Sequence, residues 1–267
     1  MIIKKIFYTA LVLIVMVAAA VLIYSRSNRQ QPVPANNAVP VAADENADDS
    51  DPLPDDLLIK KDGILIGTEL TVADAPEGYY SDALFVGDSR FVGLQQYGRI
   101  DGALWFCSTG LGVNNYNSKG VNVSGYGDVN LETLLKKKSF GKIFICMGIN
   151  DLGYNMDKLK GRFADLFDTV RKLNPDAVLI LVSNLHVGYS RSSTDKWVNN
   201  ARLNELNGYF ESLQDGHNVF YIECNGLFDN ASGDMDAKYT HDSTHILGKY
   251  YTVWGDYIKA HAIIGKE

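Results

Sequence analysis

The chain has 267 residues, of which 46% are hydrophobic, and this is enough for one sizeable folded core. A formal net charge of −7, with no basic run beyond Lys136 to Lys138, argues against a nucleic-acid partner. The three cysteines, Cys107, Cys146 and Cys224, lie in or just after apolar runs. Their spacing fits neither a zinc site nor a disulfide framework, so we expect buried thiols.

The N-terminal segment is predicted to anchor the chain in a membrane. Residues Ile6 to Tyr24 carry no charge and are flanked on both sides by basic residues. At 1.5 Å per residue this run spans about 28 Å, close to the thickness of a hydrocarbon core. A cleavable signal peptide with its small residues at Ala18 and Ala20 is the alternative, although the apolar run continues beyond them. We expect residues 1–26 to be the anchor and the rest to be extracytoplasmic, or secreted if the segment is cleaved.

Residues 27–56 are predicted to form a linker. They are rich in Pro, Ala, Asn and Asp and show no periodicity, so they cannot bury enough apolar surface to fold. Such a linker spans about 30 Å as a coil and approaches about 90 Å when extended. Residues 57–267 are then the folded domain, starting with a hairpin over 57–66 that turns at Asp62 and Gly63.

The folded domain is predicted to be of the α/β class. Apolar runs favour strands and helical spacing favours helices, and the two kinds of segment alternate. This alternation predicts a three-layer sandwich in which a central parallel sheet is flanked by helices, with the site at the carboxyl ends of the strands. Residues 113–129, polar and rich in Asn, Gly and Tyr, are expected to be a loop over that site. The predicted strands are 83–86, 103–108, 142–147, 177–183 and 219–222, and the helices start near 91 and cover 130–138, 159–173, 197–213 and 247–261.

The sequence Gly87-Asp88-Ser89 lies at the first of these strand-to-helix junctions. A serine there has unpaired backbone N–H groups and the positive end of a helix beside it, which suits a nucleophile that develops an oxyanion. The same tripeptide is also an ordinary turn and N-cap sequence. The Gly-x-Ser-x-Gly elbow of the α/β-hydrolases is not matched, because position 91 is Phe.

Two further motifs follow in the chain. Asn150 and Asp151 come after a predicted strand, and Asp242 and His245 come just before the last helix. A carboxylate three residues before an imidazole can reach its Nδ1 and leave Nε2 free to take a proton from a serine. Each motif alone is commonly a turn or a helix start, but their occurrence in order at strand ends predicts a serine hydrolase.

With these motifs the chain resembles the SGNH, or GDSL-type, hydrolases over residues 80–263. The resemblance implies a flavodoxin-like sandwich with neither cofactor nor metal. It implies that Ser89 is the nucleophile, His245 the general base and Asp242 the residue that orients it. An oxyanion hole would be built from the amide of Ser89, the side chain of Asn150 and one glycine amide. For that glycine both Gly110 and Gly112 qualify.

Three other residues are assigned from their positions. Arg90 stands where the family commonly has Leu, so we expect it to affect substrate preference, and we expect Arg90 and Asp151 to be substrate-binding residues. His186 follows a strand end and could line the site, but a supporting or surface role is favoured.

The function expected from the sequence is a membrane-anchored extracytoplasmic serine esterase. The substrate would be a small acyl ester, with acetyl as the first choice, on cell-envelope carbohydrate that contacts polar residues of the 113–129 loop. These residues are Asn114, Asn115, Tyr116, Asn117 and Tyr126. The alternatives are an O-acyltransferase with a sugar acceptor, a lipid esterase or lysophospholipase, and a non-catalytic glycan-binding domain.

Overall fold

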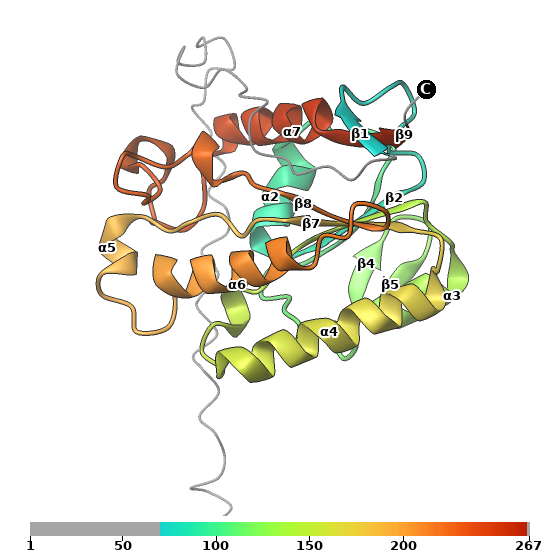
Figure 1. Ribbon diagram of the computed structural model, residues 1–267, viewed down its shortest axis with the longest axis horizontal. Helices are drawn as coiled ribbons and strands as arrows, with labels where there is room; N and C mark the ends of the chain where they lie inside the picture. The colour runs from blue at the N-terminus through green and yellow to red at the C-terminus, as the bar shows by residue number, and fades with distance from the viewer. Residues whose placement is uncertain (1–69, 266–267) are drawn as a thin grey trace, which may run out of the picture. The chain divides into compact units, whose positions relative to one another are not determined.

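The computed structural model describes residues 70–265 (Figure 1). The predicted anchor (1–26), linker (27–56) and hairpin (57–66) lie outside the described residues. Between residues 70 and 265, no helix is long and apolar enough to cross a membrane.

A five-stranded parallel sheet forms the centre of the domain, as predicted. Four of its strands are almost entirely buried and the fifth, at one edge, is half-buried, which explains why they read as continuous apolar runs rather than alternating ones. All five predicted strands are present, with ends that differ from the prediction by at most one residue. In spatial order they are β3 (Leu104–Cys107), β2 (Ala83–Gly87), β6 (Lys142–Cys146), β7 (Val178–Val182) and β8 (Val219–Ile222).

Helices cover both faces of the sheet and complete the predicted three-layer sandwich (Figure 1). One face packs against α3 (Leu131–Lys137), α4 (Met156–Leu173) and α6 (Asn200–Ser212). The other packs against α2 (Ser89–Tyr97) and α7 (Tyr251–Ala260). The helix periodicity of the sequence reflects this burial, since in α4 the side chains at helical spacing are the buried ones.

The order of the strands determines where a site forms. Numbered along the chain, the sheet strands are arranged 2-1-3-4-5, the flavodoxin-like order. In this arrangement the chain leaves the first strand on one side and the third on the other, so a crevice opens between β2 and β6 at their carboxyl ends. Ser89 follows β2 and Asn150 follows β6. The topology therefore brings the two predicted motifs to the same crevice.

Several short elements were not predicted. The expected loop 113–129 contains an antiparallel hairpin, β4 (Val121–Val123) and β5 (Gly127–Val129), so the prediction of a loop without secondary structure was wrong for its second half. Strands β1 (Leu70–Ala73) and β9 (Ala262–Gly265) form a second small sheet, and α5 (Tyr189–Ser192) is a single turn. The 3-10 turns are η2 (Ile149–Asp151), η3 (Asn225–Leu227), η4 (Ala237–Tyr239) and η5 (Gly248–Tyr250).

The cysteines behave largely as expected. Cys146 and Cys224 are buried and Cys107 is half-buried, and all three are free thiols. Burial raises the pKa of each thiol well above its usual value, so these side chains act as small apolar groups of the core.

Candidate active site

Ser89 is the first residue of α2, immediately after the buried strand β2. Asp88 caps the helix, because its Oδ1 accepts a hydrogen bond of 2.9 Å from the amide of Arg90. The amide of Ser89 belongs to the first turn of the helix, where no intrahelical acceptor exists. The junction therefore presents the Ser89 hydroxyl and an unpaired N–H at the same point.

Ser89, His245 and Asp242 form a continuous hydrogen-bonded chain, although Ser89 and His245 are 156 residues apart. Ser89 Oγ lies 2.8 Å from His245 Nε2, and His245 Nδ1 lies 2.7 Å from Asp242 Oδ2. Because the carboxylate can only accept at Nδ1, the neutral imidazole carries its proton there and accepts the serine proton at Nε2. This is the geometry of a nucleophile with an oriented general base.

The turn from Asp242 to His245 holds the carboxylate in place. Oδ1 of Asp242 accepts bonds of 2.8 Å from the backbone amides of Thr244 and His245, while Ser243 adopts a positive φ of 58°. Partial burial opposes ionisation, but the bonds from the His245 ring and from these amides outweigh it and hold the pKa of Asp242 well below its usual value. Asp242 is therefore a carboxylate at neutral pH, as the orienting role requires.

Asn150 lies on the second side of the crevice, in the η2 turn after β6. The turn is entered through Gly148, whose φ of 138° is a conformation that side chains rarely adopt. Asn150 is exposed, and its Nδ2 donates a bond of 2.9 Å to the carbonyl of Leu111. An amide nitrogen has two hydrogens, so this bond orients the side chain and leaves one hydrogen for an oxyanion.

The structure distinguishes the two candidate glycines. The amide of Gly112 donates to Asn115 Oδ1 at 2.9 Å, and Gly112 is buried against Asp151, where an added Cβ would lie 2.2 Å from the carboxylate. Gly112 therefore has a structural role, and the assignment of its amide to the oxyanion hole is wrong. Gly110 is exposed, has a φ of 73° and is the remaining glycine candidate.

Comparisons with known proteins agree with this geometry. The model of the GDSL-like Lipase/Acylhydrolase family matches residues 85–251, which include every residue of the proposed triad and oxyanion hole. The chain belongs to this family. It is a serine hydrolase that acts on ester bonds. The comparison with curated protein sequences gives no significant match.

Solved structures of the same fold show low sequence identity to this GDSL hydrolase. A GDSL-like lipase from Bacteroides thetaiotaomicron aligns with a TM-score of 0.51 at 16% identity, over 69% of this chain and 89% of that one. A Streptococcus pneumonia protein described as a candidate platelet activating factor aligns with a TM-score of 0.52 at 18% identity, over 67% and 82%. At these identities the likeness concerns the fold.

Asp151 is buried, so the prediction that it is a substrate-binding residue is wrong. It is 4% exposed, and its two carboxylate oxygens accept bonds from the amide of Val113 at 2.8 Å and from Asn114 Nδ2 at 2.6 Å. Burial raises the pKa of Asp151, although both bonds oppose this effect. The carboxylate therefore ties the η2 turn, which also carries Asn150, to the segment after β3.

Arg90 is also wrongly predicted as a substrate-binding residue. Its side chain is 1% exposed and turns into the interior, where Nη1 donates to the carbonyl of Leu185. Burial lowers the pKa of its guanidinium and raises the pKa of the neighbouring Asp88 carboxyl, while each charge favours the other. Arg90 thus links the nucleophile turn to the segment after β7 and has no surface with which to contact a substrate.

The asparagines of the 113–129 loop bond to neighbouring segments of the protein. Asn114 binds Asp151, Asn115 binds Gly112 and Gly110, and Asn117 exchanges bonds with Glu132. The rings of Tyr116 and Tyr126 are half-buried against the core. These bonds fix the first half of the 113–129 segment, which has no regular strand pairing of its own.

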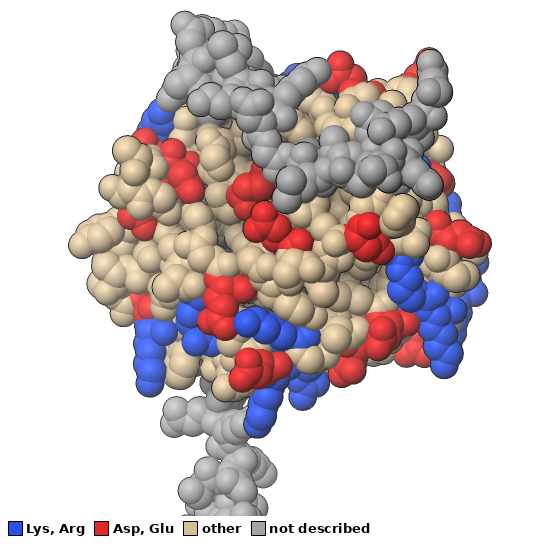
Figure 2. Space-filling model, in the orientation of Figure 1, with Lys and Arg blue, Asp and Glu red and all other residues tan. Residues whose placement is uncertain are grey.

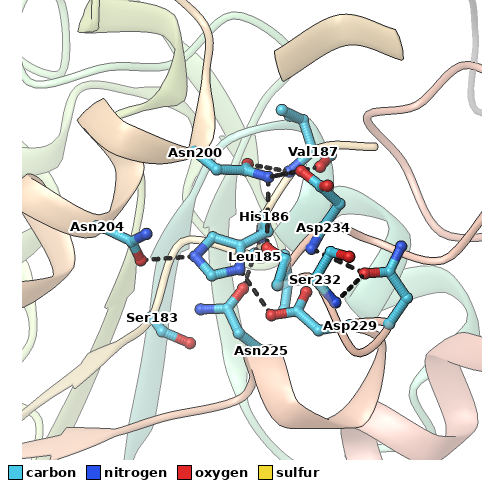
Figure 3. A network of polar contacts seen from close by, with 12 residues as sticks. Ser183, Leu185, His186, Val187, Asn200, Asn204, Asn225, Asp229, Ser232 and Asp234 are labelled. Atoms are coloured by element: carbon cyan, nitrogen blue, oxygen red, sulfur yellow. Dashed lines mark hydrogen bonds and ion pairs between the residues drawn. The ribbon is translucent and has the colours of Figure 1, made fainter. Parts of the chain in front are cut away.

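His186 is buried in a polar network beside the site (Figure 3). Its Nδ1 lies 2.7 Å from Asp229 Oδ2 and its Nε2 lies 2.7 Å from Asn204 Oδ1, while its amide donates to Asn225. The network joins the end of β7 to α6 and to the 225–235 segment (Figure 3). His186 is therefore held inside this network and is neither a surface residue nor one that lines the site.

The residues of α5 were missed by the sequence analysis. The amide of Gly188 donates to the carbonyl of Ser243 at 2.9 Å, and Ser190 Oγ lies 2.6 Å from Ser243 Oγ. Arg191 Nη1 donates to Thr244 Oγ1. These contacts hold the turn that carries Asp242 and His245. No periodicity marks a single helical turn, so only the glycine before it could have drawn notice.

Proposed function

We propose that this GDSL hydrolase is a membrane-anchored extracytoplasmic esterase that removes small acyl groups, with acetyl as the first choice, from cell-envelope carbohydrate. The observation that carries the catalytic part is the unbroken chain from Ser89 Oγ through His245 to Asp242, with contacts of 2.8 and 2.7 Å. The anchor and linker rest on the sequence of residues 1–56.

The first half of the reaction uses both sides of the crevice. Ser89 Oγ attacks the ester carbonyl carbon while its proton passes to His245 Nε2. The negative charge that develops on the carbonyl oxygen is stabilised by the amides of Ser89 and Gly110 and by the free amide hydrogen of Asn150. Asp242 stabilises the imidazolium. The bond to the alcohol then breaks, His245 returns the proton to the alcohol oxygen, and an acyl-Ser89 intermediate remains.

The second half regenerates the serine. A water molecule gives a proton to His245 and attacks the acyl carbon, and collapse of the second tetrahedral intermediate releases the acid while Ser89 Oγ recovers the proton from His245. The same three N–H groups hold the oxyanion again. If a sugar hydroxyl took the place of water, the product would be a new ester, which is the acyltransferase alternative.

The exposed surface supports a small acyl group. Between residues 70 and 265 the exposed large hydrophobic side chains are three aromatic ones, Tyr154, Tyr189 and Trp197, and none is aliphatic. A long acyl chain contributes about 0.8 kcal/mol per buried methylene and needs an apolar groove to enclose many of them. The predicted linker would also let the domain reach away from the bilayer, whereas a lipid esterase benefits from lying on it.

The test is the dependence of kcat/KM on acyl length for soluble esters, with Ser89→Ala as the inactive control. We expect activity to be highest with acetyl esters. Activity that rises steadily to about eight carbons or more would overturn the small-acyl proposal and favour a lipid esterase. Adding a free sugar acceptor and analysing the products separates hydrolysis from acyl transfer, and protease digestion of intact cells tests the extracytoplasmic location.

A further inference from the structure

The exposed aromatic side chains lie in the segments that follow β6 and β7. Tyr154, which is 44% exposed, follows η2, while Tyr189 (70%) and Trp197 (43%) lie in and after α5. Isolated exposed aromatic residues are common on protein surfaces and need no explanation by themselves. However, the three lie at different positions relative to the predicted catalytic residues, and Tyr189 is the one beside the turn that carries His245.

Tyr189 is held beside the turn that carries the general base. The residues on either side of it, Gly188 and Ser190, both bond to Ser243, at 2.9 and 2.6 Å. Ser243 itself lies between Asp242 and His245. In Figure 1, α5 lies beside the segment that leads into α7, and in Figure 2 the surface over α5, at the left edge of the view, is mainly uncharged. Tyr189 therefore stands on a turn that is fixed to the 242–245 turn, and its ring is largely exposed.

Trp197 and Tyr154 are placed differently. The Trp197 ring has Lys196 Nζ at 4.5 Å and Arg202 Cζ at 5.7 Å from its centroid, so cations already lie over it. Arg202 also donates to the carbonyl of Tyr154 at 2.6 Å, which ties both aromatics to α6. Among the residues from 70 to 265, no aromatic ring or cation is recorded over the Tyr189 ring. Tyr189 is the most exposed of the three, and it is the one whose neighbours in the chain bond to the 242–245 turn.

The proposed reaction indicates which part of the substrate lies near Tyr189. His245 gives its proton to the leaving alcohol, so the alcohol oxygen must lie beside Nε2 when the ester bond breaks. The alcohol part of the substrate then extends over the side of the crevice formed by the 242–245 turn and α5. On the opposite side, the side chains of Asn114, Asn115 and Asn117 form hydrogen bonds with Asp151, Gly112 and Glu132.

We propose that Tyr189 is a specificity-determining residue whose ring packs against the apolar face of a sugar ring in the alcohol part of the ester. This inference rests on the proposed function and names the residue that selects its carbohydrate substrate. A tyrosine ring is suited to the role because it is large and rigid, with few rotatable bonds to restrain on binding.

The experiment compares kcat/KM for two acetyl esters with different alcohols, O-acetylated chitotriose and ethyl acetate, using the full chain. In Tyr189→Ala we expect the ratio of the two values to fall about tenfold, equal to about 1.4 kcal/mol, chiefly through KM for the sugar ester. Tyr189→Phe keeps the ring and should keep the ratio. Trp197→Ala removes an aromatic that is also exposed and should leave the ratio unchanged.

The other outcomes separate the two proposals. If the wild-type chain hydrolyses ethyl acetate but not acetylated chitotriose, the proposed carbohydrate substrate and this inference both fail. If it hydrolyses both and Tyr189→Ala keeps the wild-type ratio, the inference alone fails. An equal loss on both esters would show that Tyr189 only supports the catalytic turn, and this too would overturn a role in specificity.

Discussion

Two histidine–aspartate pairs lie near the carboxyl edge of the sheet, and their first contact is the same. His245 Nδ1 lies 2.7 Å from Asp242 Oδ2, and His186 Nδ1 lies 2.7 Å from Asp229 Oδ2. The pairs differ at the other ring nitrogen. Nε2 of His245 faces the hydroxyl of Ser89, whereas Nε2 of His186 faces an amide oxygen of Asn204. A histidine oriented by a carboxylate is therefore not in itself a catalytic feature.

The two histidines also differ in how far their side chains are exposed. The His245 side chain is 21% exposed and faces the crevice, while that of His186 is 9% exposed and enclosed by α6 and the 225–235 segment (Figure 3). Because both ring nitrogens of His186 face oxygen acceptors, both are satisfied only when both carry a proton. The geometry of the His245 pair allows it to accept a proton from Ser89, whereas the His186 pair holds its proton between two oxygen acceptors.

The largest expected effect is the difference between His245→Ala and His186→Ala in kcat. His245→Ala should lower kcat by about 10⁴-fold or more, because the serine then has no base, while the fold remains intact. His186→Ala should reduce kcat far less, since its ring does not touch the reacting atoms. Steady-state kinetics on an acetyl ester checks both, with circular dichroism to confirm folding. Equal losses in two folded variants would place His186 in the proton path.

The next effect concerns Asp242. In the described part of the chain, the contact recorded for His245 Nδ1 is to the Asp242 carboxylate. Asp242→Asn should therefore cost nearly as much in kcat as His245→Ala, since the amide favours the wrong tautomer of the imidazole. Asp229→Asn is the matched control and should change kcat much less. If Asp242→Asn proved mild, another group would have to orient His245.

Two asparagines extend the comparison to the amide side chains. Asn150→Ala should lower kcat by about 10² to 10³-fold with a smaller effect on KM, which is the usual cost of one oxyanion donor. Asn204→Ala removes an amide from the His186 network and should leave kcat close to the wild-type value. Steady-state kinetics of both variants on the same ester tests this difference in kcat. A wild-type rate in Asn150→Ala would move the oxyanion hole elsewhere.

The sequence predicted those parts of the molecule that depend on continuous patterns. Strands β2, β6, β7 and β8 are buried on both faces and so appear as apolar runs, and α4 shows its buried stripe at helical spacing. The hairpin 121–129 and α5 were missed, because three-residue strands and a four-residue helix are shorter than two periods of the strand or helix pattern, so no repeat can be seen. Their positions depend on tertiary contacts.

The candidate triad of Ser89, His245 and Asp242 could be proposed from the sequence because its motifs come in a fixed order, and the structure brings the three side chains into contact. The supporting residues could not be proposed in this way. The sequence alone does not distinguish an exposed arginine from a buried one. The burial of Arg90 depends on a hydrogen bond to the carbonyl of Leu185, which is distant in the sequence. An asparagine that binds a sugar is likewise indistinguishable in sequence from Asn114, which binds Asp151. Which partner a polar side chain finds is decided by the fold.

Loss of the His186–Asp229 pair should lower the stability of the chain, whereas loss of the His245–Asp242 pair should lower its activity. His186→Ala leaves the Asp229 carboxylate, whose side chain is 15% exposed, without its partner, and breaking such a pair costs about 3 kcal/mol of unfolding free energy. Urea unfolding of His186→Ala, Asp229→Ala and the double variant measures the coupling. Strictly additive losses would show that the two side chains do not stabilise each other.

The smallest effect is the dependence of that stability on pH. Burial disfavours the charged imidazole, but the bonds to Asp229 and Asn204 and the charges of Asp229 and Glu223 outweigh burial and raise the pKa of His186. A raised pKa in the folded state means that the folded chain holds the proton more tightly than the unfolded chain. The contribution of His186 is therefore complete below the unfolded value of about 6.5 and is lost as pH rises through the folded value.

His186→Gln provides the reference for this measurement, because glutamine is polar and does not titrate. The difference in unfolding free energy between wild type and His186→Gln should be largest at about pH 5.5 and should shrink at about pH 8.5. Asp242 has the opposite sign: its lowered pKa stabilises the fold above about pH 4 and is lost in acid, which lies outside this window. A difference that grew with rising pH would mean that His186 is neutral in the folded chain, and the distinction between its pair and the catalytic pair would then rest on burial alone.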